Sequence, residues 1–193
     1  MGRQKTISDE EVLRVARDLF RAQGHTVTTR EIAEAAGISE AVLYQRFGSK
    51  DDLFFAAMHP HGPDVEALLG PKDPPDEAHV YLRTVVVRLG KYFADVIPLA
   101  LRVMTHPSFE PARLPRPRMG GQAVLRDGLT ERIATLQRRK QLAPLAAGVI
   151  ARLLLSLAHD WALGCVFSSD SPAHRERELK EMVEAVWQGL RPR

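Results

Sequence analysis

Ala41 and Gln45 carry the side chains of this sequence that best suit the edges of DNA bases. A glutamine amide can pair with N6 and N7 of adenine, and an alanine methyl group can contact the methyl group of thymine. The two residues are four positions apart, so on a helix they lie on one face. Glu40 could also reach a base edge, although its place in the first turn of such a helix favours an interaction with the helix dipole.

A helix that presents these side chains is predicted by the sequence around them. Thr28 and Glu31 match the pattern of a capping box, which begins a first short helix. Gly37 ends that helix, because glycine adopts the left-handed backbone of a helix C-terminus at the lowest cost. Ser39 can cap a second helix that carries Leu43 inward. Two short helices joined by such a turn form a helix-turn-helix, whose second helix enters the major groove of DNA.

The start of the first of these helices supplies groups for the DNA backbone. Thr28, Thr29 and Arg30 lie there, beside backbone N–H groups that a helix N-terminus leaves unpaired. Contacts of this kind hold phosphates, which sets the register of a protein on the duplex rather than the sequence that it reads. The primary role expected of Thr28 is the helix cap, and Ser39 likewise combines a cap with an expected DNA contact.

The same stretch and its flanks, from about Ser8 to Met58, resemble the DNA-binding head of the TetR (tetracycline-repressor-type) family of bacterial transcription regulators. The resemblance is carried by LFRAQG at Leu19–Gly24, by AAGIS at Ala35–Ser39 and by LYQRFGSKDDLF at Leu43–Phe54. This combination is far more specific than a generic helix-turn-helix, but it covers only the first third of the chain.

The resemblance implies that the hydroxyl of Tyr44 and the ammonium of Lys50 contact phosphates. Lys50 would begin a further helix, whose dipole adds to its effect. The alternative for Tyr44 is a packing residue with a hydrated hydroxyl. The family often has histidine where this chain has Arg46, so two roles stay open for Arg46: a further phosphate contact, or a position in solvent.

Apolar periodicity and helix breakers predict an all-α chain of two domains and about nine helices. Residues 1–58 form the helix-turn-helix DNA-binding head, which begins with a helix at residues 9–23. Residues 59–193 form a larger helical domain for regulation and dimerisation. Its main helices are expected at residues 76–96, 98–106, 121–140, 146–167 and 172–189. The proline-rich segment 107–117 is expected to be an irregular, mobile loop.

The last two expected helices carry more apolar surface than one core needs. Residues 146–167 are apolar nearly all round, and residues 172–189 carry a clean apolar stripe. In the family the last two helices of each chain pack against their twofold mates, so the resemblance implies a homodimer; the alternative is that both stripes are internal core. The residues expected at the dimer interface are Leu157, Leu179, Met182, Val183, Val186 and Trp187.

The resemblance also implies a ligand pocket in the larger domain. Its candidate residues are Tyr81, Arg88, Tyr92, Met104, His106, His159 and Trp161. Mixed aromatic, sulfur and polar groups suit such a pocket, although each of these residues has an ordinary role in a core or in solvent as its alternative. Arg88 lies between Tyr81 and Tyr92 in the sequence, which suggests an anionic or carbonyl-bearing ligand, because a guanidinium donates in a planar fork.

Composition limits the class of protein only weakly. The chain has 193 residues, of which 45% are apolar and 26% charged, as expected for a soluble protein with a real core. Its net charge of +3 permits nucleic-acid binding without demonstrating it. Cys165 is the single cysteine, which excludes an intramolecular disulfide and is consistent with the reducing cytoplasm. The N-terminus lacks the apolar region of a secretory signal, and we expect neither a membrane span nor membrane binding.

The first residues match Met-Gly-x-x-x-Thr, a pattern for N-myristoylation. The pattern is short and therefore weak evidence for a lipid. A flexible arm in which Arg3 and Lys5 approach DNA phosphates is the preferred interpretation.

Catalytic and metal-binding patterns are missing from the sequence. The seven histidines show no H-E-x-x-H spacing, no cysteine accompanies them, and neither a phosphate-binding glycine loop nor G-x-S-x-G occurs. We therefore expect no catalytic residue, no metal and no cofactor. The sequence predicts a homodimeric TetR-like repressor that binds a palindromic double-stranded DNA operator and is released by a small-molecule effector. The alternatives are a ligand-independent DNA-binding dimer and an enzyme with an appended helix-turn-helix.

Overall fold

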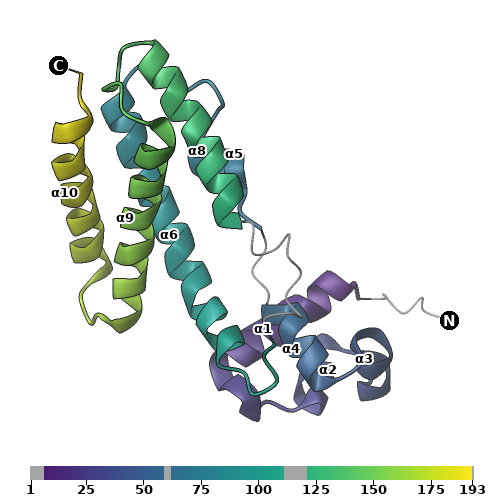
Figure 1. The fold of residues 1–193 in the computed structure, drawn as a ribbon. Coiled ribbons are helices and arrows are strands. Elements are labelled where there is room, and N and C mark those ends of the chain that lie inside the picture. Colours follow the sequence, from purple (N-terminus) through teal and green to yellow (C-terminus); the bar gives the residue numbers. More distant parts are fainter. Residues whose placement is uncertain (1–6, 59–61, 111–120, 193) are drawn as a thin grey trace. The chain divides into compact units, whose positions relative to one another are not determined.

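The computed structural model describes residues 7–58, 62–110 and 121–192, and within them all regular secondary structure is helical (Figure 1). Nine α-helices and one short 3₁₀ helix make up the regular structure of these residues, which confirms the predicted all-α class. Arg3 and Lys5 of the expected N-terminal arm lie outside the described residues, as do residues 111–117 of the expected mobile loop.

The chain divides into two compact units. The first unit holds the described residues of Met1–Pro60 together with Leu99–Phe109, and the second holds those of His61–Pro98 together with Glu110–Arg193. The sequence predicted a single boundary, which divides the chain into residues 1–58 and 59–193. Packing adds the segment Leu99–Phe109 to the first unit.

The first unit is a small helical head in which local hydrogen bonds set the helix ends. Its elements are α1 (Asp9–Gln23), the 3₁₀ helix η1 (Gly24–Thr26), α2 (Thr29–Ala36), α3 (Glu40–Phe47) and α4 (Lys50–Met58). The predicted capping boxes of Ser8 and Thr28 are both present, each closed by a glutamate three residues later. Gly37 has a φ of 68°, the left-handed conformation expected where α2 ends. Phe20 is fully buried and meets the Phe54 ring edge-on at 5.1 Å between centroids.

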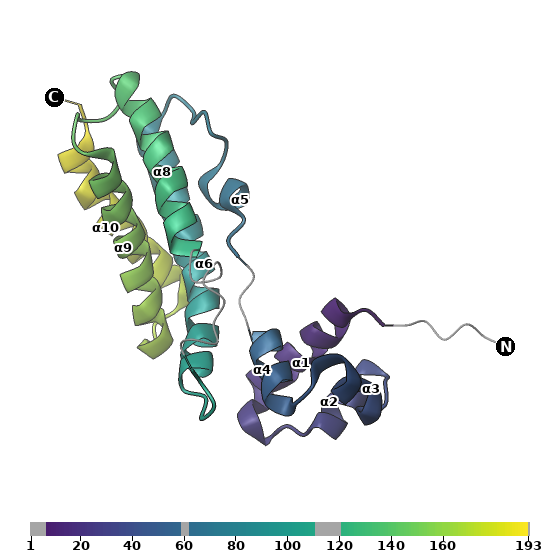
Figure 2. The same ribbon diagram turned by 45° about the vertical axis from the view of Figure 1, so that its right-hand side comes forward.

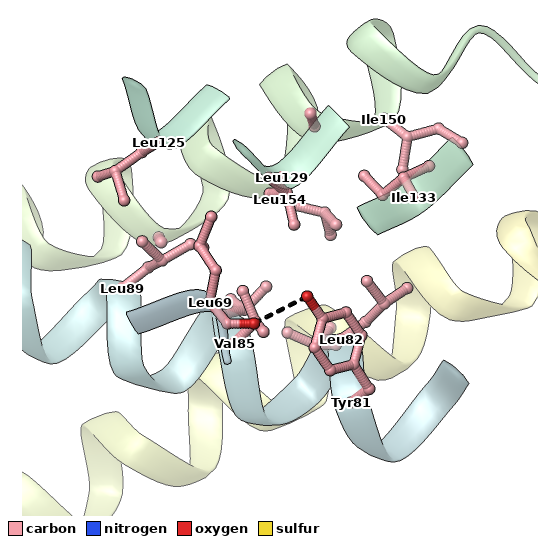
Figure 3. Packing of buried hydrophobic residues seen from close by; sticks show 14 of the residues in the cluster. Leu69, Tyr81, Leu82, Val85, Leu89, Leu125, Leu129, Ile133, Ile150 and Leu154 are labelled. Atoms are coloured by element: carbon pink, nitrogen blue, oxygen red, sulfur yellow. Dashed lines mark hydrogen bonds between the residues drawn. The ribbon is translucent and has the colours of Figure 1, made fainter. Parts of the chain in front are cut away.

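The second unit is a bundle of longer helices. It contains α5 (Val65–Leu69), most of α6 (Ala78–Met104), α8 (Gly121–Arg138), α9 (Ala147–Phe167) and α10 (Pro172–Leu190). In this bundle α9 packs against both α8 and α10 (Figure 2). Its core joins Leu82 and Leu89 of α6 to Leu129 of α8 and Leu154 of α9 (Figure 3).

Gly90 allows α6 to approach α9 and α10 closely. A Cβ atom at this position would lie 2.8 Å from Cδ2 of Leu179 and 3.0 Å from Cε3 of Trp161. Real Cβ atoms essentially never approach other atoms at 2.8 Å, so a larger side chain would require the buried Leu179 side chain and the Trp161 ring to shift.

The helix α6 corrects one prediction. The sequence suggested two helices separated before Pro98, but a single helix runs through this proline to Met104. A proline inside a helix removes one hydrogen bond and costs about 3 kcal/mol or more. Burial on both sides offsets that cost, because Ile97 is buried in the second unit and Leu99 and Val103 are buried in the first.

A buried arginine fixes the connection that precedes α6. Arg132 of α8 is 3% exposed. Its guanidinium donates to the carbonyl oxygens of Pro71 at 3.0 Å, Gly128 at 2.9 Å and Gly70 at 2.5 Å. Three carbonyl acceptors replace the water that the buried cation loses. The chain around Gly70 is thereby held to α8.

Candidate nucleic-acid interface and ligand pocket

The outer face of α3 presents the two residues that we expect to read bases. Ala41 and Gln45 are exposed, and the Gln45 amide has no hydrogen bond among the residues that the structure describes. Leu43 is buried on the opposite side of the helix. The face of α3 is therefore free to meet a groove, as the spacing of Ala41 and Gln45 predicts.

A hydrogen-bonded group of three side chains ties α3 to the start of α2. The hydroxyl of Thr29 donates to the carboxylate of Glu40, and the Thr29 and Tyr44 hydroxyl oxygens are 3.1 Å apart. Because the single Thr29 proton goes to a carboxylate, the Tyr44 hydroxyl must donate to Thr29. Thr29 is 8% exposed and Tyr44 is 45% exposed. Thr29 therefore helps to position α3 through Glu40 and Tyr44, while Tyr44 stays accessible to a phosphate.

Arg46 and Lys50, the two cations that follow Tyr44, differ in the groups that they contact. Arg46 does not lie free in solvent: its Nη1 donates to the Ile7 carbonyl at 2.8 Å and lies 3.3 Å from the Asp9 carboxylate. Its side chain is 22% exposed, so it fastens α3 to the start of α1. Lys50 begins α4, and its Nζ donates to the carbonyl oxygen of His25 at 2.8 Å. This ammonium retains two further N–H donors.

The remaining expected DNA-contact residues serve as caps or lie on the surface. Thr28 and Ser39 cap α2 and α3, and each hydroxyl accepts a backbone N–H at 3.2 Å. Hydrogen bonds from the Thr28 backbone and hydroxyl lower the pKa of the Glu31 carboxyl. Arg30 is exposed and pairs with Glu34 at 3.1 Å on the surface of α2, where such a pair is easily exchanged for a phosphate.

The end of α6 packs into this head rather than into a ligand pocket. Arg102 donates from Nη1 to the carbonyl oxygens of Phe20 and Arg21, at 2.7 and 2.8 Å. His106 is 7% exposed, and its ring lies 4.5 Å from those of both His25 and Phe54. We call Arg102 and His106 the α6 anchor. Sequence reasoning missed this role, because the partners lie far away in the chain.

Polar contacts fix the orientation of the His106 ring. Its Nδ1 accepts the backbone N–H of Ser108 at 3.0 Å, and its Nε2 lies 3.7 Å from the Asp51 carboxylate. The Ser108 hydroxyl donates to the same carboxylate at 2.5 Å. Burial lowers the pKa of His106, and His25 lowers it further, against the opposing effect of Asp51. The neutral ring is therefore the form that this site favours.

The head matches a known family of DNA-binding domains. The family model described as bacterial regulatory proteins, tetR family, matches residues 12–57, which include the whole helix-turn-helix. Residues 12–57 therefore form a DNA-binding head of the TetR-family type.

Solved structures share the fold of this protein over nearly the full length of the chain. A protein described as a TetR-family transcriptional regulator from Mesorhizobium loti MAFF303099 is 18% identical, with a TM-score of 0.73 over 95% of this chain and 96% of its own. A transcriptional regulator from Rhodococcus sp. Rha1 is 23% identical, with a TM-score of 0.65 over 95% and 98% of the two chains. A regulator from Saccharomonospora viridis, solved in complex with choline, is 20% identical, with a TM-score of 0.66 over 95% and 97%. These low identities show a common fold.

The second unit contains a pocket of about 550 Å³ between α6, α8 and α9. Of the seven expected ligand residues, His159 alone lines it. Among the described residues, the lining consists of Phe93, Gln122, Ala123, Arg126, Arg152, Leu155, Ser156 and His159. A signal for Arg152 was present in the sequence, since it is a cation within an otherwise apolar helix.

The other expected ligand residues lie elsewhere. Tyr81 is buried and donates to the Leu69 carbonyl at 2.9 Å (Figure 3), and burial raises the pKa of its phenol to about 12. Tyr92 is half-buried, and burial raises the pKa of its phenol too. Arg88 is exposed, 3.5 Å from the Ala67 carbonyl. Trp161 donates to the Arg175 carbonyl at 2.7 Å. Met104 is 60% exposed in the first unit, which also contains His106.

The residues expected at the dimer interface lie mainly inside the bundle. Leu179 and Val183 are 0% and 2% exposed in the core of their own subunit. Leu157, Val186 and Trp187 pack partly against that core, whereas Met182 lines a smaller hollow between α9 and α10. The stripe of α10 thus follows the alternative that the sequence left open, an internal core.

Apolar surface without a cover lies on α9 instead. Val149 is 66% exposed and Phe167 is 79% exposed, and Leu153, Leu163 and Val166 are also exposed. By length and composition α9 could cross a membrane, but such a test is also met by core helices of soluble proteins. Only 28% of its most apolar window is buried. The sequence predicted excess apolar surface on both of the last two helices, and the structure shows it on α9.

Proposed function

We propose that this chain is a homodimeric TetR-family transcription regulator in the cytoplasm, acting as a repressor that leaves its operator when a small molecule binds. The observation that carries the proposal is the exposed face of α3, where Ala41 and Gln45 are free and Tyr44 is held at the edge of α2. That face lies within the segment that matches the family model. Gln45 and Ala41 would read bases, while Tyr44, Lys50 and Arg30 would hold phosphates.

A dimer is supported by the uncovered apolar surface of α9. Val149 and Leu153 lie one helical turn apart, as do Leu163 and Phe167, and exposed apolar groups of this kind often mark a protein–protein contact. A second copy would cover it through a twofold contact, in which the same residues of both chains meet. Two heads per dimer would then read the two halves of a palindromic operator.

Control by a small molecule is supported by the pocket of about 550 Å³, a size typical of ligand sites. A ligand-independent dimer would have the same head and dimer surface but no response to any small molecule. An enzyme with an appended helix-turn-helix would need a reactive group, and no cluster of three potential metal ligands occurs in the described part of the chain. The pocket therefore favours the ligand-controlled regulator over both alternatives.

A binding-site selection tests base reading directly. Wild-type protein should select a palindromic motif, and Gln45→Ala should lose preference at one base position per half-site, worth about 1–3 kcal/mol if a bidentate pair is lost. Gln23→Ala is the matched control, because Gln23 is an exposed glutamine of the same unit outside α3. Identical motifs from wild type and Gln45→Ala would remove Gln45 from base reading.

Sedimentation tests the dimer. Leu153→Glu places a carboxylate on the apolar surface of α9 and should give monomers that fail to bind the operator, because an unpaired charge in a dry contact is costly. Val80→Glu is the control, since Val80 is exposed to a similar extent on α6. An intact Leu153→Glu dimer would show that the subunits meet elsewhere.

A further inference from the structure

We propose that the pocket between α6, α8 and α9 takes an organic anion, a carboxylate carried by an apolar body. This inference rests on the proposed function, since it names the chemical class of the effector. It follows from the described side chains that line the pocket, which combine cations with an apolar wall and include no carboxylate.

The cationic side of the pocket comes from two helices. Arg126 lies on α8, and Arg152 and His159 lie on α9. Arg152, Ser156 and His159 recur at helical spacing, so they line one side of α9. A guanidinium donates a planar pair of N–H groups that matches a carboxylate, and Ser156 and Gln122 supply further donors.

The hydrogen-bond partners of Arg126 and Arg152 leave both guanidinium groups able to bind an anion. The Arg126 guanidinium donates to the carboxylate of the adjacent Asp127, at 3.0 and 3.1 Å, an exposed local pairing that a ligand can replace. Arg152 has no hydrogen bond or ion pair with any residue that the structure describes. Both guanidinium groups line the same pocket, so one bound anion can interact with both.

The apolar side of the pocket suits the body of the ligand. Phe93 of α6 is 4% exposed, and its ring meets the ring of His159 edge-on at 5.4 Å between centroids. Leu155 and Ala123 complete this wall. A ligand of this class would direct its carboxylate to the arginines and its apolar body to Phe93. A cationic ligand would meet two guanidinium groups and is disfavoured.

Isothermal titration of the full-length protein tests the proposal with probes of matched shape. The probes are 2-naphthoate and decanoate, with 2-naphthamide as the uncharged counterpart of the first. We expect a carboxylate probe to bind once per chain and the amide to bind at least about tenfold more weakly.

Two charge-removing variants locate the site. Arg152→Gln and Arg126→Gln should each weaken carboxylate binding by about tenfold, because each removes a charged donor. Arg83→Gln is the matched control, an exposed arginine of α6 outside the pocket, and should bind as wild type does. All three residues are exposed, so the variants should fold; circular dichroism checks this.

The outcomes separate this inference from the proposed function. Failure of both carboxylates to bind, equal binding of 2-naphthamide and 2-naphthoate, or unchanged binding by Arg152→Gln and Arg126→Gln would overturn the anion site. Operator release is measured separately, by fluorescence anisotropy of labelled DNA. Carboxylate binding that follows the expected pattern without any release would uphold the site and overturn its role as the effector site.

Discussion

Lys50 and Arg46 lie four positions apart in the head, but the structure predicts that only Lys50 contributes to the salt dependence of DNA binding. The Lys50 ammonium donates one proton to the His25 carbonyl and keeps two donors for a phosphate. The Arg46 guanidinium is bound to the Ile7 carbonyl and the Asp9 carboxylate and is 22% exposed. Lys50→Ala should therefore remove a phosphate contact, whereas Arg46→Gln should remove a tie between α3 and the start of α1.

The magnitude follows from counterion release. One phosphate contact per head is two per dimer, and each contributes a slope of about −0.9 in log K against log of the salt concentration. Lys50→Ala should make the slope shallower by about 1.8. Between 50 and 200 mM salt, wild-type affinity should then fall about twelvefold further than the affinity of the variant. Arg46→Gln should keep the wild-type slope and lose about 1 kcal/mol of stability, the net value of a partly exposed hydrogen bond.

Fluorescence anisotropy with the selected operator at four salt concentrations measures the slopes, and urea unfolding measures stability. Arg14→Gln is the control for charge alone, because Arg14 is exposed on α1 beside Asp18. An unchanged slope for Lys50→Ala would remove this residue from the interface. A slope that Arg46→Gln lowers by the same amount would show that Arg46 leaves α1 when DNA binds, which refutes the distinction between the two cations.

Three further predictions concern stability. Arg132→Met should lower the free energy of unfolding in urea by about 2–4 kcal/mol, because it leaves the carbonyls near Gly70 unpaired, whereas the exposed Arg138→Met should change it by less than about 0.5 kcal/mol. Gly90→Ala should lower the melting temperature, since overpacking of about 1–3 kcal/mol exceeds the gain of up to about 1 kcal/mol in helix propensity. The pKa of His106 is lower in the folded protein than in the unfolded chain, so the unfolded chain takes up the proton at a higher pH. The free energy of unfolding of the wild type should therefore decrease as pH falls below about 6.5. His106→Phe should flatten this decrease, which urea titrations at successive pH values measure.

Much of the head could be predicted from sequence because its helix ends depend on residues within a few positions of one another. Ser8 with Glu11, and Thr28 with Glu31, close their capping boxes over three residues. Gly37 ends α2 through its own backbone conformation. The exposure of Gln45 follows from its place opposite Leu43 on a short helix.

The errors arose where distant residues decide the outcome. Pro98 signals a helix break locally, but burial of its neighbours in both units carries α6 through it. Arg46 finds its partners 37 and 39 positions away, and Arg132 finds two of its acceptors 61 and 62 positions away. His106 has a residue type that suits a ligand pocket, yet its place in the head depends on tertiary contacts with His25 and Phe54. Residue type and spacing do not reveal such partners.

The helix α6 contributes residues to both units, so under the proposed function we expect it to couple the pocket to the head. Phe93 lines the pocket, and nine residues later the helix reaches Arg102, which forms the α6 anchor in the head together with His106, just beyond the helix. A bound ligand can lower operator affinity only if it prefers the conformation that does not bind DNA.

The same coupling must act in reverse, so saturating operator should weaken 2-naphthoate binding by the factor by which 2-naphthoate weakens operator binding. Arg102→Met removes the two hydrogen bonds to the end of α1 and should reduce this factor while leaving the Kd of 2-naphthoate for free protein unchanged. Titrations of ligand with and without operator, on wild type and variant, measure both quantities. If the factor is the same in the variant, the α6 anchor does not transmit the signal, because a change confined to the head has then left the coupling between the two sites intact.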